Sequence, residues 1–220
     1  MVFGIVSGMA RPRRQERRRA ELVEAARQIV VEQGVLALRL TDVAKRVGLA
    51  PASVLYYYSA LTELLREVQD QAVERFCSAR AEAGRGETDP RRRLAAMIRS
   101  GLPTGPGDEL CRLLYELGTV ARHDPAYAAR YIDLYQRQVA LYVGILEAGT
   151  ALGHFNMTDD ATTIARNLVV LEDGYGLHMT MAVPTFDVAT SARQLIGYAA
   201  TATRCDLAAF APADTEADPR

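Results

Sequence analysis

The sequence predicts an all-α protein, with an N-terminal three-helix domain that holds a helix-turn-helix and a larger C-terminal helical domain. Strand patterns are scarce along the 220 residues, whereas apolar residues recur three and four positions apart, as they do on one face of an α-helix. Glycine and proline interrupt this pattern at intervals typical of helices. The N-terminal quarter is basic and the remainder is acidic.

Four helices are predicted in the N-terminal part, each with a recognisable start or stop. Gly34 ends the first helix, which has one apolar face. Thr41 is a candidate cap for a short second helix that ends at Gly48, and Pro51 takes the first position of the third, which proline favours. The four predicted helices cover residues 17–33, 41–47, 51–58 and 61–83.

Five more helices are predicted in the rest of the chain. The dipeptide Asp124-Pro125 is a strong start signal, because aspartate caps a helix and proline fits its first turn. Thr158 and Thr185 are the expected starts of the last two helices. We expect the acidic tail, residues 211–220, to be disordered. The five predicted helices cover residues 91–101, 109–121, 125–153, 158–182 and 185–207.

The helix predicted at 158–182 is apolar on more than one face, although Glu172, Asp173 and His178 interrupt it. A helix of this kind is buried on several sides, and a second subunit is one source of that cover. We therefore expect a homodimer that pairs through residues 158–182 and 185–207. A central core helix in a monomer is the alternative.

Composition places the chain among ordinary globular proteins, since 49% of its residues are hydrophobic and 24% are charged. No apolar run approaches the roughly 20 residues that a membrane span needs, so we expect a cytoplasmic protein without a membrane partner. The apolar opening MVFGIVSGMA is short and has no basic residue ahead of it, which makes it a poor signal peptide. Either Met1 or Met9 could be the true start.

The three cysteines, Cys77, Cys111 and Cys205, are far apart and form no CxxC motif. This spacing predicts neither a disulfide framework nor a zinc site. We therefore expect reduced thiols, no metal site and no cofactor. A thiol or metal sensor that combines these cysteines with a histidine is an alternative that the spacing does not favour.

Charge divides the chain into two unlike parts. Residues 1–58 carry ten Lys or Arg against five Asp or Glu, whereas the remainder carries sixteen against twenty-two. Such a chain can meet a polyanion with its basic end alone. Six of the ten basic residues lie in the run RPRRQERRR, from Arg11 to Arg19. We expect residues 1–15 to form a flexible basic arm.

Residues 39–58 have the organisation of a DNA-reading motif: a short helix, a tight turn and a second helix that begins with small residues. The major groove is about 12 Å wide and admits one helix. Ala52 and Ser53 would let the backbone approach the DNA. Tyr56 and Tyr57 would direct hydroxyls toward phosphates, and Tyr58 would pack inward.

Residues 16 to about 66 resemble the DNA-binding domain of the TetR family of bacterial regulators. The segments AELVEAARQIVVEQG, LRLTDVAKRVGLAPASVLYYY and LTELLREV carry the resemblance, which implies a DNA-binding domain at 16–62. Three positions depart from the family pattern: Ala50 replaces the usual serine cap, Leu55 a phosphate-contacting tyrosine and Leu61 a lysine. The arginine-rich arm is a candidate replacement for these contacts. The remaining matched positions for DNA contact are Arg39, Thr41, Pro51, Ala52, Ser53, Tyr56 and Tyr57.

The segment HDPAYAARYIDLYQRQVALYVGILEAGTALGHF, followed by LEDGYG, is similar to the sensor domains of the BetI-like subgroup of this family. The similarity implies that residues 63–210 form a ligand-binding domain whose last two helices make a four-helix bundle with a second subunit. It does not imply choline as the ligand. Aromatic residues at helical spacing are more often core than ligand contacts. The candidate ligand contacts are Tyr115, Tyr135, Gln138, Tyr142, Asn167 and Glu172.

The function expected from these features is that of a sequence-specific transcriptional regulator. We expect a repressor that responds to a small organic ligand and acts as a homodimer on a palindromic operator. An activator of the same fold is an alternative, as is an all-α enzyme. The enzyme is disfavoured because His123, His154 and His178 are scattered and no nucleophile lies beside a base in sequence.

Overall fold

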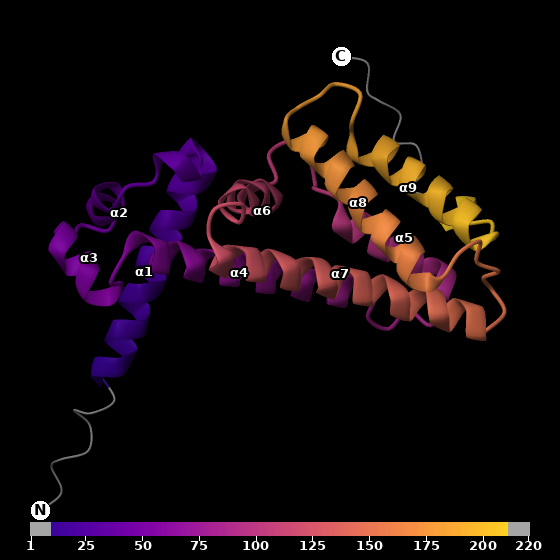
Figure 1. The fold of residues 1–220 in the computed structure, drawn as a ribbon, viewed down its shortest axis with the longest axis horizontal. Coiled ribbons are helices and arrows are strands. Elements are labelled where there is room, and N and C mark those ends of the chain that lie inside the picture. Colours follow the sequence, from indigo (N-terminus) through magenta and orange to yellow (C-terminus); the bar gives the residue numbers. More distant parts are fainter. Residues whose placement is uncertain (1–9, 211–220) are drawn as a thin grey trace, which may run out of the picture.

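The computed structural model describes residues 10–210, and in this range every regular element is helical (Figure 1). The all-α prediction is confirmed. None of these helices combines the length and hydropathy that a membrane-spanning helix requires. The helices are α1 (Ala10–Gln33), α2 (Leu40–Arg46), α3 (Pro51–Tyr57), α4 (Leu61–Ala83), α5 (Pro90–Gly101), α6 (Glu109–Val120), α7 (Pro125–Ala151), α8 (Ala161–Thr180) and α9 (Val188–Thr203), with short 3-10 turns η1 (Val35–Ala37) and η2 (Ala208–Phe210).

The N-terminal boundary differs from the prediction. Residues 10–15, which we expected in a flexible arm, belong to α1. Ion pairs that join Arg17 and Arg18 to Glu21 lie one turn apart on this helix and support its first turns. The predicted arm residues 1–9 and the predicted tail 211–220 lie outside the described residues.

Aspartates, rather than the predicted threonines, begin the helices of the C-terminal part. Thr158 is not a helix start, because its N–H and hydroxyl both bond to the carbonyl of Ala202 at 2.8 and 3.2 Å. Thr41 lies inside α2, whose cap position is Arg39. A carboxylate at a cap accepts a backbone N–H and also favours the positive end of the helix dipole. The aspartate caps are Asp89, Asp108, Asp124, Asp160 and Asp187.

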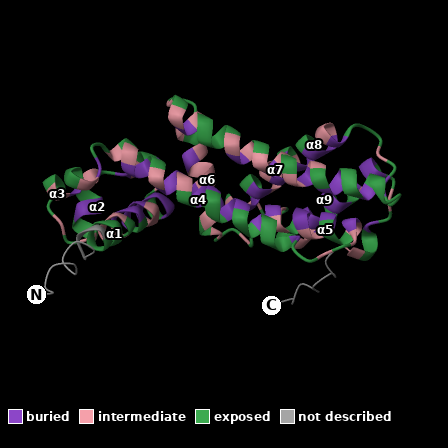
Figure 2. Ribbon diagram, turned by 90° about the horizontal axis from the view of Figure 1, so that it is seen from below, coloured by how far each residue is buried: buried purple, intermediate pink, exposed green. Residues whose placement is uncertain are grey.

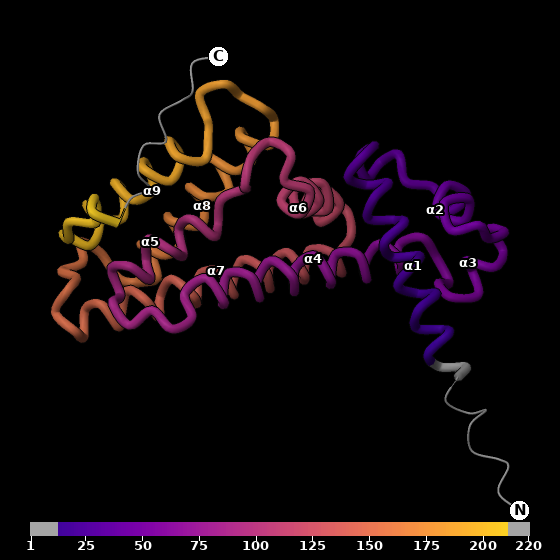
Figure 3. Tube along the Cα trace, turned by 180° about the vertical axis from the view of Figure 1, so that it is seen from behind, coloured from indigo at the N-terminus to yellow at the C-terminus, as the bar shows by residue number. Residues whose placement is uncertain are grey.

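The molecule has two parts, which we call the head and the body. The head consists of α1, α2, α3 and the start of α4, and α4 then runs into the body alongside α7 (Figures 1 and 3). The body adds α5, α6, α8 and α9. Buried and exposed residues alternate along α8 and α9, so each helix has an inward and an outward face (Figure 2).

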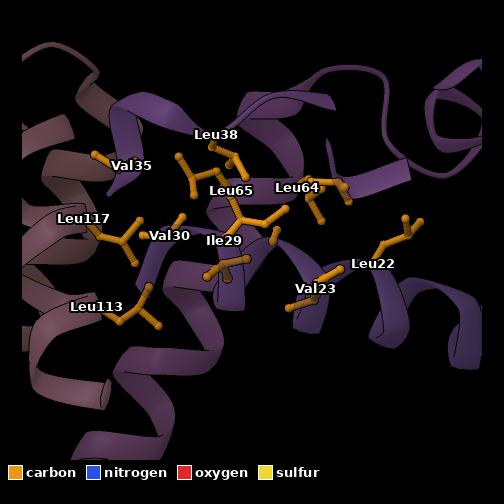
Figure 4. Packing of buried hydrophobic residues seen from close by; sticks show 14 of the residues in the cluster. Leu22, Val23, Ile29, Val30, Val35, Leu38, Leu64, Leu65, Leu113 and Leu117 are labelled. Atoms are coloured by element: carbon orange, nitrogen blue, oxygen red, sulfur yellow. The ribbon is translucent and has the colours of Figure 1, made fainter. Parts of the chain in front are cut away.

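The head does not have a core of its own. Leu113 and Leu117 of α6 belong to the same buried cluster as Val30 and Val35 of the head (Figure 4). A second cluster fills the space between α5, α7, α8 and α9. Because α6 is part of the head's core, a movement of α6 would displace α1, which packs directly against it.

Candidate functional site

The turn between α2 and α3 is tight and depends on one glycine. Gly48 has φ +67°, a conformation that glycine adopts without steric cost. The N–H of Leu49 returns to the carbonyl of Ala44 at 2.8 Å. Pro51 is the first residue of α3, as predicted. This turn sets the angle between the two helices of the motif.

The inner face of α3 is held by contacts with both α1 and α4. Val54 and Tyr58 are fully buried, so the inward packing predicted for Tyr58 is confirmed. The guanidinium of Arg19, on α1, lies 4.2 Å from the centre of the Tyr58 ring and donates to the carbonyl of Tyr57 at 2.9 Å. Glu67, on α4, accepts from Arg19 at 2.7 Å and from the Tyr58 hydroxyl at 2.8 Å. Burial and the nearby carboxylate raise the pKa of Tyr58.

The outer face of α3 is exposed. Leu55 and Tyr56 are 49% and 76% exposed, and Ala52 lies one turn before Tyr56. Tyr57 is half-buried and packs edge-on against Tyr56, with ring centres 5.2 Å apart. The same surface therefore presents the residues that the sequence singled out on α3. Among the predicted DNA contacts, those classed as exposed are Arg39, Thr41, Pro51, Ala52 and Tyr56, and those classed as half-buried are Ser53 and Tyr57.

Exposed arginines lie near this surface, some without hydrogen bonds to other described residues and one bonded to backbone carbonyls. Arg13 and Arg14, near the start of α1, are exposed. Arg39, at the start of α2, is also exposed but donates to the carbonyls of Leu36 and Leu38 at 2.7 and 3.0 Å. These exposed arginines can contact DNA phosphates without first breaking an ion pair within the described residues.

A partly open pocket lies in the body between α4, α5, α6, α7 and α8, and its internal free volume is about 40 Å³. We call it the sensor pocket. Of the six predicted ligand contacts, Tyr115, Tyr135 and Gln138 line it. Tyr131, spaced four and seven residues before Tyr135 and Gln138 on α7, completes an aromatic wall. The lining residues are Phe76, Gly101, Cys111, Leu114, Tyr115, Tyr131, Leu134, Tyr135, Gln138 and Asp173.

Two predicted ligand contacts, Tyr142 and Glu172, do not line the pocket but belong to a buried ion pair beside it. Arg80 donates to both carboxylate oxygens of Glu172, at 3.0 and 3.2 Å, and the Tyr142 hydroxyl donates to the same carboxylate. Burial raises the pKa of Glu172 to about 7, against the opposing effect of Arg80. The pair packs on the α5 backbone at Gly101, where any side chain would collide with it.

The acidic residue that does face the pocket is Asp173. Burial raises the pKa of its carboxyl to about 6, and Arg80 opposes the rise. Among the described residues, none donates a hydrogen bond to this carboxylate, and Arg80 is already paired with Glu172. The pocket therefore combines a carboxylate without a cation of its own with the rings of Phe76 and three tyrosines. Chemically, that set attracts a cation.

Asn167, the sixth predicted ligand contact, does not line the sensor pocket. Asn167 is exposed on α8, and its side-chain amide donates to the Tyr198 hydroxyl of α9 at 2.8 Å. Its position is six residues from Asp173, which places the two on different faces of the helix. Asn167 thus belongs to the outward face of the body.

Helix α6 joins the sensor pocket to the head. Tyr115 lines the pocket, and its hydroxyl packs on Gly176 of α8, where a side chain would collide with it. On the side of the head, Glu116 accepts from the backbone N–H of Val35 at 3.0 Å, and Arg112 donates to a carbonyl of α1 at 3.1 Å. Gly176 thus makes room for a contact inside the subunit.

Sequence reasoning missed several lining residues. Leu134 could have been found, because it continues the α7 spacing of Tyr131 and Gln138. Phe76 and Cys111 look like ordinary core residues in sequence, and nothing local marks them. Burial raises the pKa of Cys111 to about 12, so its thiol is unreactive at neutral pH. Between residues 10 and 210 no three His, Cys, Asp or Glu gather as metal ligands do.

Comparison with solved structures gives the same fold. A putative transcriptional regulator from Saccharomonospora viridis, in complex with choline, has a TM-score of 0.77 and 22% identity, and the match covers 83% of this chain and 95% of that one. A TetR transcription regulator from Haloarcula marismortui has a TM-score of 0.76 and 23% identity, over 85% of this chain and 98% of that one.

Sequence comparison gives the family. The HTH-type transcriptional regulator BetI of Rhizobium meliloti is 24% identical over 167 residues, which are 74% of this chain and 78% of that protein. Residues 22–68 match the model of the bacterial regulatory proteins of the tetR family, and residues 90–203 match that of the C-terminal part of BetI-type transcriptional repressors. The chain therefore belongs to the TetR family of transcriptional regulators, which are not enzymes, and its C-terminal part is of the BetI type.

Proposed function

We propose that this regulator binds a palindromic operator as a homodimer and releases it when a small organic cation enters the sensor pocket. The observation that carries the choice of ligand is the Asp173 carboxylate, which faces an aromatic wall and has no described hydrogen-bond donor.

The charges around the pocket favour a ligand with one positive charge. Arg80 and Glu172 neutralise each other, so Asp173 leaves an excess negative charge in a desolvated place. A buried charge is costly unless it is paired, and a bound cation supplies the partner. Aromatic rings are the usual surroundings of quaternary ammonium groups in proteins. The choline bound to the Saccharomonospora viridis regulator supports this class of ligand.

The outward face of α8 supports the dimer. Five exposed residues, spaced alternately by three and four positions, form a stripe along this helix: Asn167, Val170, Gly174, Leu177 and Met181. Val170 and Met181 are 61% and 65% exposed. Three exposed apolar side chains on one face, here Val170, Leu177 and Met181, are typical of an interface between helices. A second copy of α8 and α9 is the partner we propose for it.

The route from the pocket to the DNA runs through α6. A ligand held between Asp173 and Tyr115 contacts α6 directly, and α6 holds α1 by packing and by the bonds of Arg112 and Glu116. If the ligand fits better when the two heads of the dimer are misplaced, binding shifts the population away from the operator-bound form. The two reading helices would then no longer match half-sites about 34–36 Å apart.

The test begins with selection of random duplex DNA by the purified protein at two salt concentrations. We expect an inverted repeat and binding that weakens steeply with salt. Choline and tetramethylammonium are then titrated into the complex, with Asp173→Asn as the variant and Asp133→Asn, a carboxylate outside the pocket on α7, as its control.

The wild type and Asp133→Asn should release the operator at the same cation concentration, and Asp173→Asn should need at least tenfold more. Operator binding that no organic cation affects would contradict the ligand class. The absence of any enriched repeat would contradict the proposed function as a whole.

A further inference from the structure

The reading helix α3 has an unusual chemical character for a helix that faces DNA. From Pro51 to Tyr57 it carries no charged or amide side chain. Its outer face is formed by Ala52, Leu55 and Tyr56, which share one side because they are spaced three and four residues apart. Val54 on the opposite side is fully buried. The helix therefore offers DNA a largely apolar surface, on which the hydroxyls of Ser53, Tyr56 and Tyr57 are the side-chain hydrogen-bonding groups.

The position of this surface is determined by strong contacts. Arg19 and Glu67 hold the C-terminal end of α3 from two helices, and Val54 anchors its middle in the head's core. Rotation of α3 to hide Leu55 would expose Val54 and break these contacts. The exposure of Leu55 is thus a consequence of the fold rather than of a mobile loop.

In the major groove, the edges of the base pairs present hydrogen-bond donors and acceptors, and one apolar group, the C5-methyl of thymine. An aliphatic side chain placed on a guanine or cytosine edge displaces water and returns no hydrogen bond, which is unfavourable. The same side chain on a thymine methyl buries apolar surface on both partners. Leu55 also cannot donate a hydrogen bond to a phosphate.

We infer that Ala52 and Leu55 select operator half-sites by packing on thymine methyl groups in the major groove. This inference rests on the proposed function of α3 as the DNA-reading helix. The exposed arginines of α1 and α2 supply affinity that is independent of sequence, and the apolar face of α3 supplies the preference for thymine. Half-sites without thymine at the contacted positions are excluded by desolvation of their polar edges.

The test uses the operator obtained by selection and replaces thymine with deoxyuridine, which lacks only the C5-methyl. Replacement within the half-sites should weaken binding about fourfold per contacted methyl, the factor expected for burial of one such group. Replacement in the flanking DNA, which alters the duplex equally but touches no reading helix, should change the affinity less than twofold.

A double-mutant cycle assigns the effect to the side chain. Leu55 is exposed, so Leu55→Ala leaves the core intact, and this variant should lose most of the discrimination between thymine and uracil. Leu152→Ala, which truncates a leucine that is more exposed than Leu55 and lies at the far end of α7, should keep all of it.

Each outcome decides a different point. Enriched half-sites without thymine, or equal binding of thymine and uracil operators, would overturn the inference while leaving the proposed function in place. Full discrimination by Leu55→Ala would overturn the role of that residue. Failure to enrich any sequence would overturn the proposed function and the inference with it.

Discussion

The isolated charge of Asp173 should cost the protein stability. Burial raises the pKa of this carboxyl from 3.8 to about 6, which corresponds to about 3 kcal/mol of unfavourable free energy when the group is ionised. Because the side chain is only partly buried by accessible area, screening by solvent reduces this figure to about 1–2 kcal/mol. We predict that Asp173→Asn is more stable than the wild type by that amount at pH 7.5.

The sign of the pH dependence makes this prediction sharper. The folded protein holds the proton of Asp173 more tightly than the unfolded chain does, so the contribution of this residue to stability is most favourable below about pH 4 and is lost as the pH rises through about 6. Asp173→Asn lacks this contribution. Its advantage should therefore shrink as the pH falls through about 6 and be small at about pH 4, where the wild-type carboxyl is protonated in the folded state and about half protonated in the unfolded chain.

The assay is guanidinium unfolding of both proteins at equal concentration across this pH range, with Asp133→Asn as the control. At equal concentration, an organic cation should stabilise Asp173→Asn by at least about 1.4 kcal/mol less than the wild type, the difference that corresponds to tenfold weaker binding. A variant that is less stable than the wild type at pH 7.5, or an advantage that is as large at pH 4 as at pH 7.5, would refute the reasoning.

Three further predictions follow from the ion pairs and the exposed surfaces. Arg80→Met should lower the free energy of unfolding by about 3–5 kcal/mol in denaturant titrations, because it leaves a buried carboxylate unpaired; a loss below about 1 kcal/mol would contradict a buried pair. Replacing Arg13 and Arg14 together with Ala should reduce the dependence of DNA binding on log salt by about one to two in slope; an unchanged slope would show that neither meets a phosphate. Val170→Asp should convert the dimer to monomer in light scattering, whereas Leu152→Asp at the far end of α7 should not; a Val170→Asp dimer would place the interface elsewhere.

Local signals in the sequence determined where most helices lie. Predicted and observed bounds agree for α4 at both ends, and Pro51, Asp124 and Gly34 mark helix ends where capping chemistry expects them. These signals depend on a residue and its neighbours within one turn. The motif at 39–58 was readable for the same reason, since the turn at Gly48 is local. The start of α8 was not readable in this way, because Thr158 bonds to the distant carbonyl of Ala202 and Asp160 caps the helix instead.

The content of the sensor pocket was decided by tertiary structure. Glu172 and Asp173 are consecutive and similar in sequence, yet one is paired with Arg80 and the other faces the cavity. Adjacent residues on a helix point about 100° apart, so the phase of α8 against α4 and α6 gives them different roles. That phase results from packing among helices far apart in the chain. The packing requires glycine at positions 101 and 176, because a side chain at either position would collide with a neighbouring helix. The sequence by itself thus determined the helices and the reading motif, and only the packing of the helices decided which side chains meet the ligand.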